Sequence, residues 1–318
     1  MKIVVLDAYT GNPGDLSWQP MRELGELILY DRTPPELIIE RGMEADAILI
    51  NKIVITRQMM EQWPRLRYIG VIATGFNIVD IEAARDHGIV VTNVPSYSTP
   101  SVAQLTMAHL LNICCQVQHY TDEVREGMWS RCPDFSFTDT RLMEIADKRM
   151  GIVGFGQIGQ AVAKIALSFG MKVTAFTSKE ASALPSGVDK AESLDALMTD
   201  CDVVSLHCPL NDETRGMIDR RRIALMKPTA ILLNTSRGPL IDEPALVEAL
   251  TEGRIMAAGL DVMAVEPPRD DNPLLTAPNC YFTPHIAWAS AEARARLMVI
   301  ITRNLKTFME GHPENKVN

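Results

Sequence analysis

Short apolar runs alternate with amphipathic stretches along most of the chain. In the first third, four runs rich in Val, Ile and Leu are typical of buried strands: Ile3–Leu6, Ala47–Ile50, Tyr68–Ala73 and Ile89–Asn93. Polar or amphipathic segments that suit helices lie between them. This alternation predicts a parallel sheet covered by helices, and therefore an α/β domain.

A second pattern begins at residue 151 and has the same rhythm. Its six strand signals are Gly151–Gly154, Lys172–Phe176, Asp202–His207, Ala230–Asn234, Ala257–Val262 and Cys280–Phe282. Six strands with helices between them match a doubly wound dinucleotide-binding domain. We also expect an apolar helix from Pro100 to Val117 and a final helix from about Ser290 to Glu310. Residues 129–148 show little periodicity, which predicts an arm or a long loop.

Three glycines mark the first turn of this second pattern. A G-x-G-x-x-G motif, made by Gly154, Gly156 and Gly159, lies between a predicted strand and a predicted helix. The first glycine of such a turn permits the tight bend, the second lets backbone approach a pyrophosphate, and the third lets the helix pack close to the strand. The N–H groups that open the helix then face the phosphates. The sequence therefore predicts a dinucleotide site here.

The end of the next strand bears on which dinucleotide binds. An acidic residue usually follows that strand and binds the ribose 2′-OH of NAD, but Thr177, Ser178 and Lys179 stand there instead. Two hydroxyls and a lysine suit a 2′-phosphate. The sequence thus favours NADP over NAD, unless the neighbouring Glu180 turns inward.

Three ionisable residues follow later strands of the second pattern. Arg237 can bind a carboxylate and a carbonyl oxygen in a forked geometry, and His285 can give a proton to that oxygen. Glu266 can orient the imidazole and favour its protonated form. Taken singly, these residues are typical of a surface turn, a structural histidine and a loop. Because all three follow a dinucleotide-binding glycine motif in the sequence, they together indicate hydride transfer at a 2-oxo acid.

Two strand ends of the first domain are candidate substrate contacts. Asn51 and Lys52 follow one strand, and a solvated loop is as good an interpretation as a binding site. Thr74 and Gly75 follow another, where the alternatives are a simple turn and backbone N–H groups that hold a substrate carboxylate. Ligands of such sheets bind at these strand ends.

Composition narrows the classes of function. A chain of 318 residues suits two domains, and a net charge of −9 argues against a nucleic-acid partner. No run is long enough for a membrane span, and the first apolar run is too short for a signal peptide. The six cysteines show no zinc spacing, so we expect no metal and a cytoplasmic protein. His109 and His119 are interpreted as structural histidines.

These motifs together resemble the D-isomer-specific 2-hydroxyacid dehydrogenase family. The resemblance rests on Gly154–Gly159, His207–Thr214, Asn234–Gly238, Leu260–Val262 with Glu266-Pro267, and Thr283–His285, and it extends over nearly the whole chain. It implies that Arg237, Glu266 and His285 are the catalytic set and that Thr74 and Gly75 hold the substrate carboxylate.

The resemblance also implies a wider cofactor site. Thr106 and Asp261 match family positions near the nicotinamide. The remaining residues implied are Gln157, Ile158, His207, Cys208, Pro209, Thr214, Thr235, Ser236 and Ala287.

Family architecture implies a discontinuous first domain. Residues 1–97 plus 288–318 would form a flavodoxin-like substrate-binding domain, and residues 98–287 a Rossmann cofactor domain. Family dimers form through the helix after the first crossing, so we expect a homodimer.

Within the family, the segments around Glu266 and His285 look most like glycerate dehydrogenase (hydroxypyruvate reductase). The expected reaction is reduction of hydroxypyruvate or glyoxylate by NAD(P)H, with Trp288 as a wall that excludes larger side chains. One alternative is a related reductase of 2-ketogluconate or phenylpyruvate. Another is a dinucleotide-sensing interaction protein.

Overall fold

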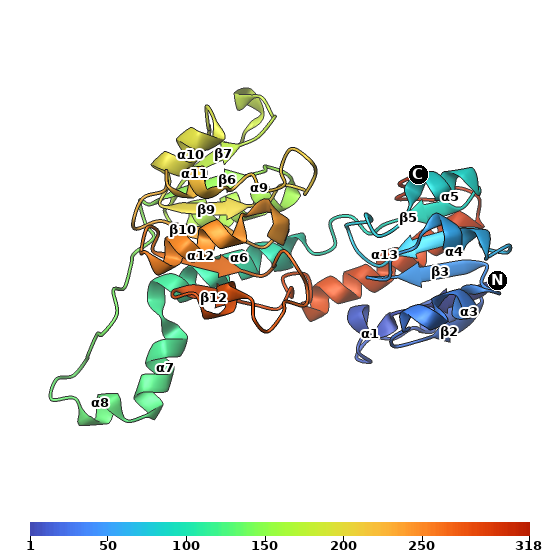
Figure 1. The fold of residues 1–318 in the computed structure, drawn as a ribbon, viewed down its shortest axis with the longest axis horizontal. Helices are drawn as coiled ribbons and strands as arrows, with labels where there is room; N and C mark the ends of the chain where they lie inside the picture. The colour runs from blue at the N-terminus through green and yellow to red at the C-terminus, as the bar shows by residue number, and fades with distance from the viewer. The chain divides into compact units, whose positions relative to one another are not determined.

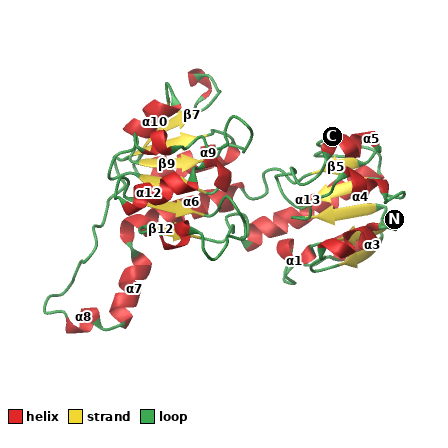
Figure 2. Cartoon of the chain, in the orientation of Figure 1, coloured by secondary structure: helices red, strands yellow, loops and turns green.

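The computed structural model describes all residues 1–318, and the chain forms two compact units (Figure 1). Unit 1 comprises residues 1–98 and 289–318, and unit 2 comprises residues 99–288. Each unit is built on one fully parallel sheet flanked by helices (Figure 2). The predicted α/β class with two parallel sheets is confirmed.

The sheet of unit 1 has the strand order β2-β1-β3-β4-β5. Its strands are β1 (Lys2–Val5), β2 (Glu26–Leu29), β3 (Ala47–Ile50), β4 (Tyr68–Val71) and β5 (Val90–Thr92). Every residue of β3 and β4 is buried, as expected for central strands covered on both faces. The sequence did not predict β2, an edge strand of four residues in which only Leu27 is buried.

Helices of unit 1 are short except for the last. They are α1 (Ala8–Gly11), α2 (Gln19–Arg22), α3 (Ile38–Gly42), α4 (Arg57–Glu61), α5 (Ile81–Asp86) and α13 (Ala291–Met309), with a 3₁₀ turn at Pro35–Leu37. Ser290 caps α13 by accepting a hydrogen bond from the N–H of Ala293. The helix buries Leu297, Ile301 and Leu305 in one stripe, as predicted from its apolar spacing.

Residues beyond α13 return to the edge strand β5. Lys316 forms a bridge with Thr92, and the side chain of Asn318 hydrogen-bonds to the backbone on both sides of Val90. The free edge of the sheet is therefore covered by the same chain.

The sheet of unit 2 has seven strands in the order β12-β11-β10-β9-β6-β7-β8. They are β6 (Arg149–Val153), β7 (Lys172–Phe176), β8 (Val188–Lys190), β9 (Val203–Leu206), β10 (Ile231–Asn234), β11 (Ala257–Leu260) and β12 (Cys280–Phe282). Six were predicted. The seventh, β8, is an edge strand of three residues, two of them exposed, so it carries little apolar signal.

Seven α-helices belong to the body of unit 2 or lead out of it. They are α6 (Thr99–Cys115), α9 (Gln157–Ser168), α10 (Leu194–Asp200), α11 (Arg220–Ile223), α12 (Glu243–Thr251) and the pair described next, with 3₁₀ turns at Ala181–Ala183, Gly238–Leu240 and Pro273–Thr276. Buried residues of α6 such as Met107 and Leu110 pack into the core under β6 and β10. None of the helices of the protein combines the length and apolarity needed to cross a membrane.

The predicted long helix ends earlier than expected. Gln116 adopts a left-handed conformation (φ 52°), which stops α6 at Cys115 and redirects the chain into α7 (Val117–Arg125). After α8 (Met128–Arg131) an extended segment returns to β6. In Figure 1, α7 and α8 project from the sheet of unit 2 as an arm. Residues 117–142 are called the arm below.

Candidate active site

The glycine turn after β6 has the geometry that each glycine was expected to provide. Gly154 has φ 92°, and a Cβ there would lie 2.6 Å from the backbone nitrogen of Cys208. A Cβ at Gly159 would lie 2.2 Å from the carbonyl oxygen of Gly154, so only glycine lets α9 approach the turn. A Cβ at Gly156 would meet no atom within 4 Å. That position faces open space, as a pyrophosphate would require.

The first turn of α9 leaves donors for an anion. The first helical hydrogen bond runs from the N–H of Gln160 to the oxygen of Gly156. The N–H groups of Gln157 and Ile158 therefore have no acceptor within the helix, and the helix dipole favours negative charge beside them. These features fit a dinucleotide pyrophosphate.

A cavity of about 410 Å³ opens between the carboxyl ends of β6, β7 and β9. The strand order reverses between β9 and β6, where doubly wound sheets bind their ligands. Nine predicted cofactor residues line the cavity: Gly154, Gly156, Thr177, Ser178, Lys179, His207, Cys208, Pro209 and Thr214. Val153, Phe155, Phe176 and Met217 also line it, and the sequence did not assign them. Their apolar character is shared with core residues, so no signal separated them.

The end of β7 presents the residues on which the cofactor preference depends. Thr177 Oγ1 accepts a hydrogen bond from the N–H of Lys179, and the Lys179 amine lies 5.8 Å from the centre of the Phe155 ring. Lys179 thus lies over the glycine turn. Glu180, the residue that would favour NAD, does not line the cavity.

His207 contributes a neutral side chain to the cavity wall. Its Nε2 lies 2.8 Å from Ser205 Oγ, and its buried Nδ1 has no partner. Burial lowers the pKa of His207 from 6.5 to about 4, so the ring carries no charge at neutral pH.

Eight predicted cofactor residues do not line that cavity: Gln157, Ile158 and Gly159 in the first turn of α9, and Thr106, Thr235, Ser236, Asp261 and Ala287 elsewhere. Thr106 on α6 is fully buried, and its hydroxyl lies 2.9 Å from that of Thr235 after β10. Ser236 donates to the carbonyl oxygen of Cys208. Their proposed contacts with a nicotinamide remain predictions.

The three candidate catalytic residues follow neighbouring strands of one sheet edge. Strands β10, β11 and β12 are adjacent, with Asn234, Leu260 and Phe282 in register at their ends. Arg237 follows β10, Glu266 lies in the segment after β11, and His285 follows β12. The sheet thus directs all three segments to the same edge.

The segment after β10 is held by Asn234, whose role the sequence did not predict. Its Oδ1 accepts the N–H of Ser236, and its Nδ2 donates to the carbonyl oxygen of Arg237. Next to it, a Cβ at Gly238 would lie 1.9 Å from the carbonyl carbon of Met263. Gly238 therefore lets the Arg237 segment pack directly on the segment that leads to Glu266.

Glu266 and His285 form the central contact of the site. Glu266 Oε2 lies 2.5 Å from His285 Nδ1, and its Oε1 accepts the N–H of Met263. The carboxylate therefore holds the ring through one nitrogen. The other nitrogen, Nε2, has no protein partner, and the His285 side chain is 24% exposed. This arrangement leaves one imidazole nitrogen available to a substrate.

Asp261 shapes the turn that carries His285. Its carboxylate accepts hydrogen bonds from the hydroxyl of Thr283 and the N–H groups of Ile286 and Ala287. His285 has φ 55°, unusual for a residue with a side chain, and its N–H donates to the oxygen of Asp261. Asp261 is buried and is engaged within the protein. Its contact with a nicotinamide stays a prediction.

His109, predicted to be structural, lies behind this turn. Its Nε2 is 2.9 Å from the hydroxyl of Thr283, and burial lowers its pKa. Trp288, the predicted pocket wall, is half-buried at the end of unit 2.

The predicted substrate residues of unit 1 lie at the carboxyl edge of its sheet. Asn51 is buried, and its Nδ2 donates to the oxygen of Ile72, while its Oδ1 has no partner. The Thr74 hydroxyl donates to Val94 O, and the N–H groups of Thr74 and Gly75 donate to no protein atom. Those two N–H groups are free for a carboxylate. Lys52 is exposed.

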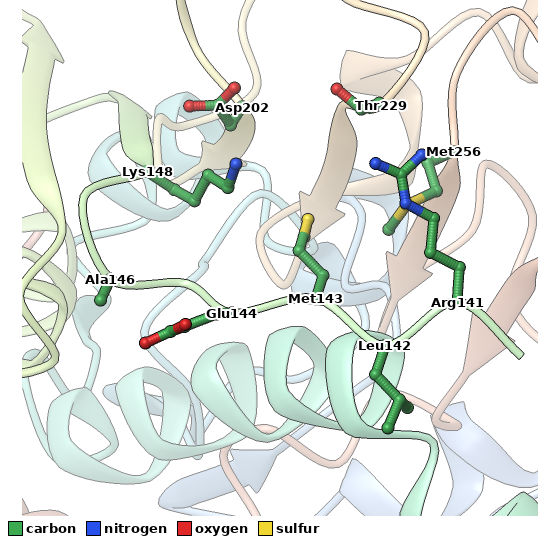
Figure 3. A pocket seen from close by; sticks show the side chains of 9 residues that line it. All are labelled: Arg141, Leu142, Met143, Glu144, Ala146, Lys148, Asp202, Thr229 and Met256. Carbon is green, nitrogen blue, oxygen red and sulfur yellow. The ribbon is translucent and has the colours of Figure 1, made fainter. Parts of the chain in front are cut away.

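A second cavity, of about 390 Å³, lies at the amino ends of the strands of unit 2, opposite the carboxyl ends that form the first cavity (Figure 3). Its side chains come from residues 141–148 and from Asp202, Thr229 and Met256, which precede or approach β9, β10 and β11. None of the predicted site residues lines it. The two cavities are therefore separated by the length of the strands.

The arm brings together His119, Glu123 and Asp139, a potential metal-ligand group that the sequence did not reveal because Asp139 is distant along the chain. His119 Nε2 lies 2.9 Å from both carboxylate oxygens of Asp139. This hydrogen bond raises the pKa of His119, which favours an ion pair.

Comparison with known proteins adds four findings, the last of them a solved structure. Residues 107–287 match the family model described as the NAD binding domain of D-isomer specific 2-hydroxyacid dehydrogenases. A hydroxypyruvate reductase of Blautia hydrogenotrophica is 49% identical, with all of both chains covered. A glycerate dehydrogenase of Methylorubrum extorquens is 39% identical over 91% of this chain and 90% of its own.

A solved structure with a similar fold contains a phosphorylated dinucleotide. It is an acyclic imino acid reductase in complex with NADPH and D-Arg, with a TM-score of 0.86 and 33% identity over the whole of both chains.

Proposed function

Because the chain belongs to the D-isomer-specific 2-hydroxyacid dehydrogenase family, we propose that it reduces hydroxypyruvate to D-glycerate, and glyoxylate to glycolate. The full-length similarity to a hydroxypyruvate reductase supports this substrate class. The observation that carries the chemistry is the hydrogen bond between Glu266 and His285, which leaves Nε2 of the imidazole for a substrate.

The proposed reaction requires one proton and one hydride. Residues such as Gly156 and Lys179 would hold a dinucleotide, which would supply the hydride for the carbonyl carbon. His285 gives its Nε2 proton to the carbonyl oxygen, so the C=O double bond becomes a C–O single bond as a C–H and an O–H bond form. Glu266 orients the ring and stabilises the imidazolium before the transfer. Arg237 binds the carboxylate and the carbonyl oxygen with its planar fork of donors.

We assign further substrate contacts to unit 1. The free N–H groups of Thr74 and Gly75 would donate hydrogen bonds to the carboxylate, and Lys52 with Asn51 would bind the polar end of a small hydroxylated acid. Trp288 would limit the size of the side chain. These assignments rest on the chemistry of the groups.

For the cofactor, we propose a preference for NADP over NAD. Thr177, Ser178 and Lys179 line the cavity at the end of β7, and no carboxylate stands among its lining residues. An acidic residue there would repel a 2′-phosphate, whereas hydroxyls and an amine bind one.

We further propose a homodimer that forms through α6 and the arm. The arm exposes several large apolar side chains, among them Val117, Met128, Trp129 and Phe135. Apolar exposure of this extent marks an interaction surface. The six cysteines are all free, which suits the cytoplasm that we propose as its compartment.

The test is steady-state reduction of hydroxypyruvate, glyoxylate, pyruvate and 2-ketogluconate, each with NADH and with NADPH. We expect hydroxypyruvate to have the highest kcat/KM and NADPH to exceed NADH. His285→Ala should lower kcat by about 100-fold or more. Cofactor affinity, measured by fluorescence titration, should not change in this variant, because His285 is not in the cofactor cavity.

Other outcomes would point to the alternatives. Preference for 2-ketogluconate would keep the family and replace the substrate. Tight cofactor binding without turnover of any 2-oxo acid would contradict an enzyme and favour a dinucleotide-sensing protein.

A further inference from the structure

Asp7 lies at the carboxyl end of β1 and was not singled out by the sequence. It directly follows Leu6, and its residue exposure is only 7%. In the strand order β2-β1-β3-β4-β5, the direction of strand addition reverses between β1 and β3. Open α/β sheets bind ligands at the carboxyl ends of the two strands that flank this reversal. Asp7 stands at that point in unit 1.

The Asp7 carboxylate holds the segment that follows β3. Its Oδ1 accepts the N–H of Asn51 at 2.7 Å, and its Oδ2 accepts the N–H of Lys52 at 2.7 Å and of Ile53 at 3.2 Å. Three consecutive backbone donors therefore converge on one side chain. Hydrogen bonds from N–H groups to an ionised carboxylate are stronger than those between neutral groups.

The same network reaches the second candidate substrate segment. The Asn51 side chain donates to the carbonyl oxygen of Ile72 at 2.7 Å, and Ile72 lies two residues before Thr74. Thr74 is in turn tied to Val94 and Asn93 beyond β5. Polar contacts thus connect the ends of β1, β3, β4 and β5, and Asp7 is the charged group among them.

We propose that Asp7 is a positioning residue that holds residues 51–53 in the conformation that receives the 2-oxo acid. The inference rests on the proposed function, in which Asn51 and Lys52 bind substrate. Asp7 itself need not touch the substrate, because its carboxylate oxygens face the backbone of the segment. It would act by fixing where the Lys52 amine and the Thr74 and Gly75 donors stand.

Asp7→Asn is the sharpest variant. An amide presents one acceptor and one donor, so whichever way it turns, at least one of the three N–H groups faces another donor. Asp46→Asn is the matched control. Asp46 also accepts a backbone N–H, from Lys2, in the same unit, but it precedes β3 at the opposite edge of the sheet.

Hydrogen–deuterium exchange and kinetics test the two parts of the proposal. In Asp7→Asn, the amides of residues 51–53 should exchange faster, and the KM for hydroxypyruvate should rise about tenfold with kcat changed less than about twofold. The dissociation constant of the cofactor should stay unchanged. Asp46→Asn should keep the wild-type KM and the wild-type exchange of residues 51–53.

The outcomes that overturn the inference differ from those that overturn the function. Unchanged exchange in Asp7→Asn would show that Asp7 does not hold the segment. Faster exchange with an unchanged KM would show that the segment does not position substrate. Equal rises of KM in both aspartate variants would indicate general loss of structure. Wild-type enzyme without 2-oxo acid reduction would contradict the proposed function before any variant is compared.

Discussion

His285 and Glu266 have separable roles at the scale of single residues. One imidazole nitrogen is bound to the carboxylate, and the other is left for chemistry. The turn that carries His285 is set by a different carboxylate, that of Asp261, through two backbone N–H groups. Orientation of the ring and placement of the turn therefore depend on different residues, and variants can separate them.

Glu266→Gln should lower kcat for hydroxypyruvate by about 10- to 100-fold, because an amide orients the imidazole without stabilising its protonated form. Glu243→Gln is a suitable control. Glu243 accepts the N–H of Ala264 and so holds the same segment without contacting His285. Its kcat should remain within about twofold of wild type. Equal losses in the two variants would mean that Glu266 acts only by holding the segment.

The lowered pKa of His207 implies that the free energy of unfolding depends on pH. Its pKa is about 4 in the folded protein and near 6.5 when unfolded, so the unfolded chain binds the extra proton between these values. The neutral His207 makes its full contribution to the free energy of unfolding above pH 6.5. This contribution decreases by about 3 kcal/mol as the pH falls towards 4. Urea denaturation at pH 7 and pH 4.5 should show a smaller loss in His207→Asn than in wild type. The same loss in both would contradict a neutral buried imidazole.

At the scale of elements, two glycines of the turn between β6 and α9 have different roles, one in cofactor binding and one in stability. Gly156→Ala should fold normally, because its Cβ would meet nothing within 4 Å, and should weaken cofactor binding at least about tenfold. Gly159→Ala should instead lower the melting temperature by several degrees, because its Cβ would overlap the oxygen of Gly154. Thermal melts and cofactor titrations of both variants test this. Gly156→Ala with wild-type affinity would contradict the pyrophosphate site.

Sequence patterns predicted the central elements and missed the marginal ones. Strands such as β3 and β11 are wholly buried and apolar, so their signal is strong. The edge strands β2 and β8 contain few buried residues. They are strands because they pair with a neighbouring strand, and the sequence does not show that pairing. The end of α6 depends on the left-handed Gln116, a residue type with no special preference for that conformation.

The site was predictable where residue type and position along the chain suffice. Glycines, Arg237, Glu266 and His285 stood out because their chemistry is distinctive and they follow strands. Asp7 accepts hydrogen bonds from backbone 44 to 46 residues away in sequence, and Asp261 from backbone 25 and 26 residues away. Such contacts arise only when strand ends meet, so a single sequence gave no sign of them.

At the scale of the whole molecule, the arm predicts an oligomer. Phe135 is 91% exposed and Trp129 is 53% exposed, and the indole N–H donates to the Phe135 oxygen, so the two residues form one projecting tip. Wild type should have twice the 35.2 kDa mass of the chain in light scattering. The double variant Trp129→Asp, Phe135→Asp should be monomeric.

Val299→Asp controls for the loss of an exposed apolar residue elsewhere. Val299 lies on α13, outside the arm, and is comparably exposed. This variant should retain the wild-type mass. A monomeric wild type, or a dimer that survives the double variant, would contradict the arm as the interface.

The discontinuity of unit 1 has a consequence for how the protein is made. Residues 99–288 are contiguous, whereas the sheet of residues 1–98 needs α13 and the segment up to Asn318, which covers the edge of β5. A ribosome makes the chain in order, at about 5–20 residues per second. Unit 2 can therefore fold during synthesis, before α13 has been made. Unit 1 cannot complete its fold until α13 and the residues after it have left the ribosome. The domain that is begun first is completed last, and its apolar strands are the part of the nascent chain that most needs chaperone protection.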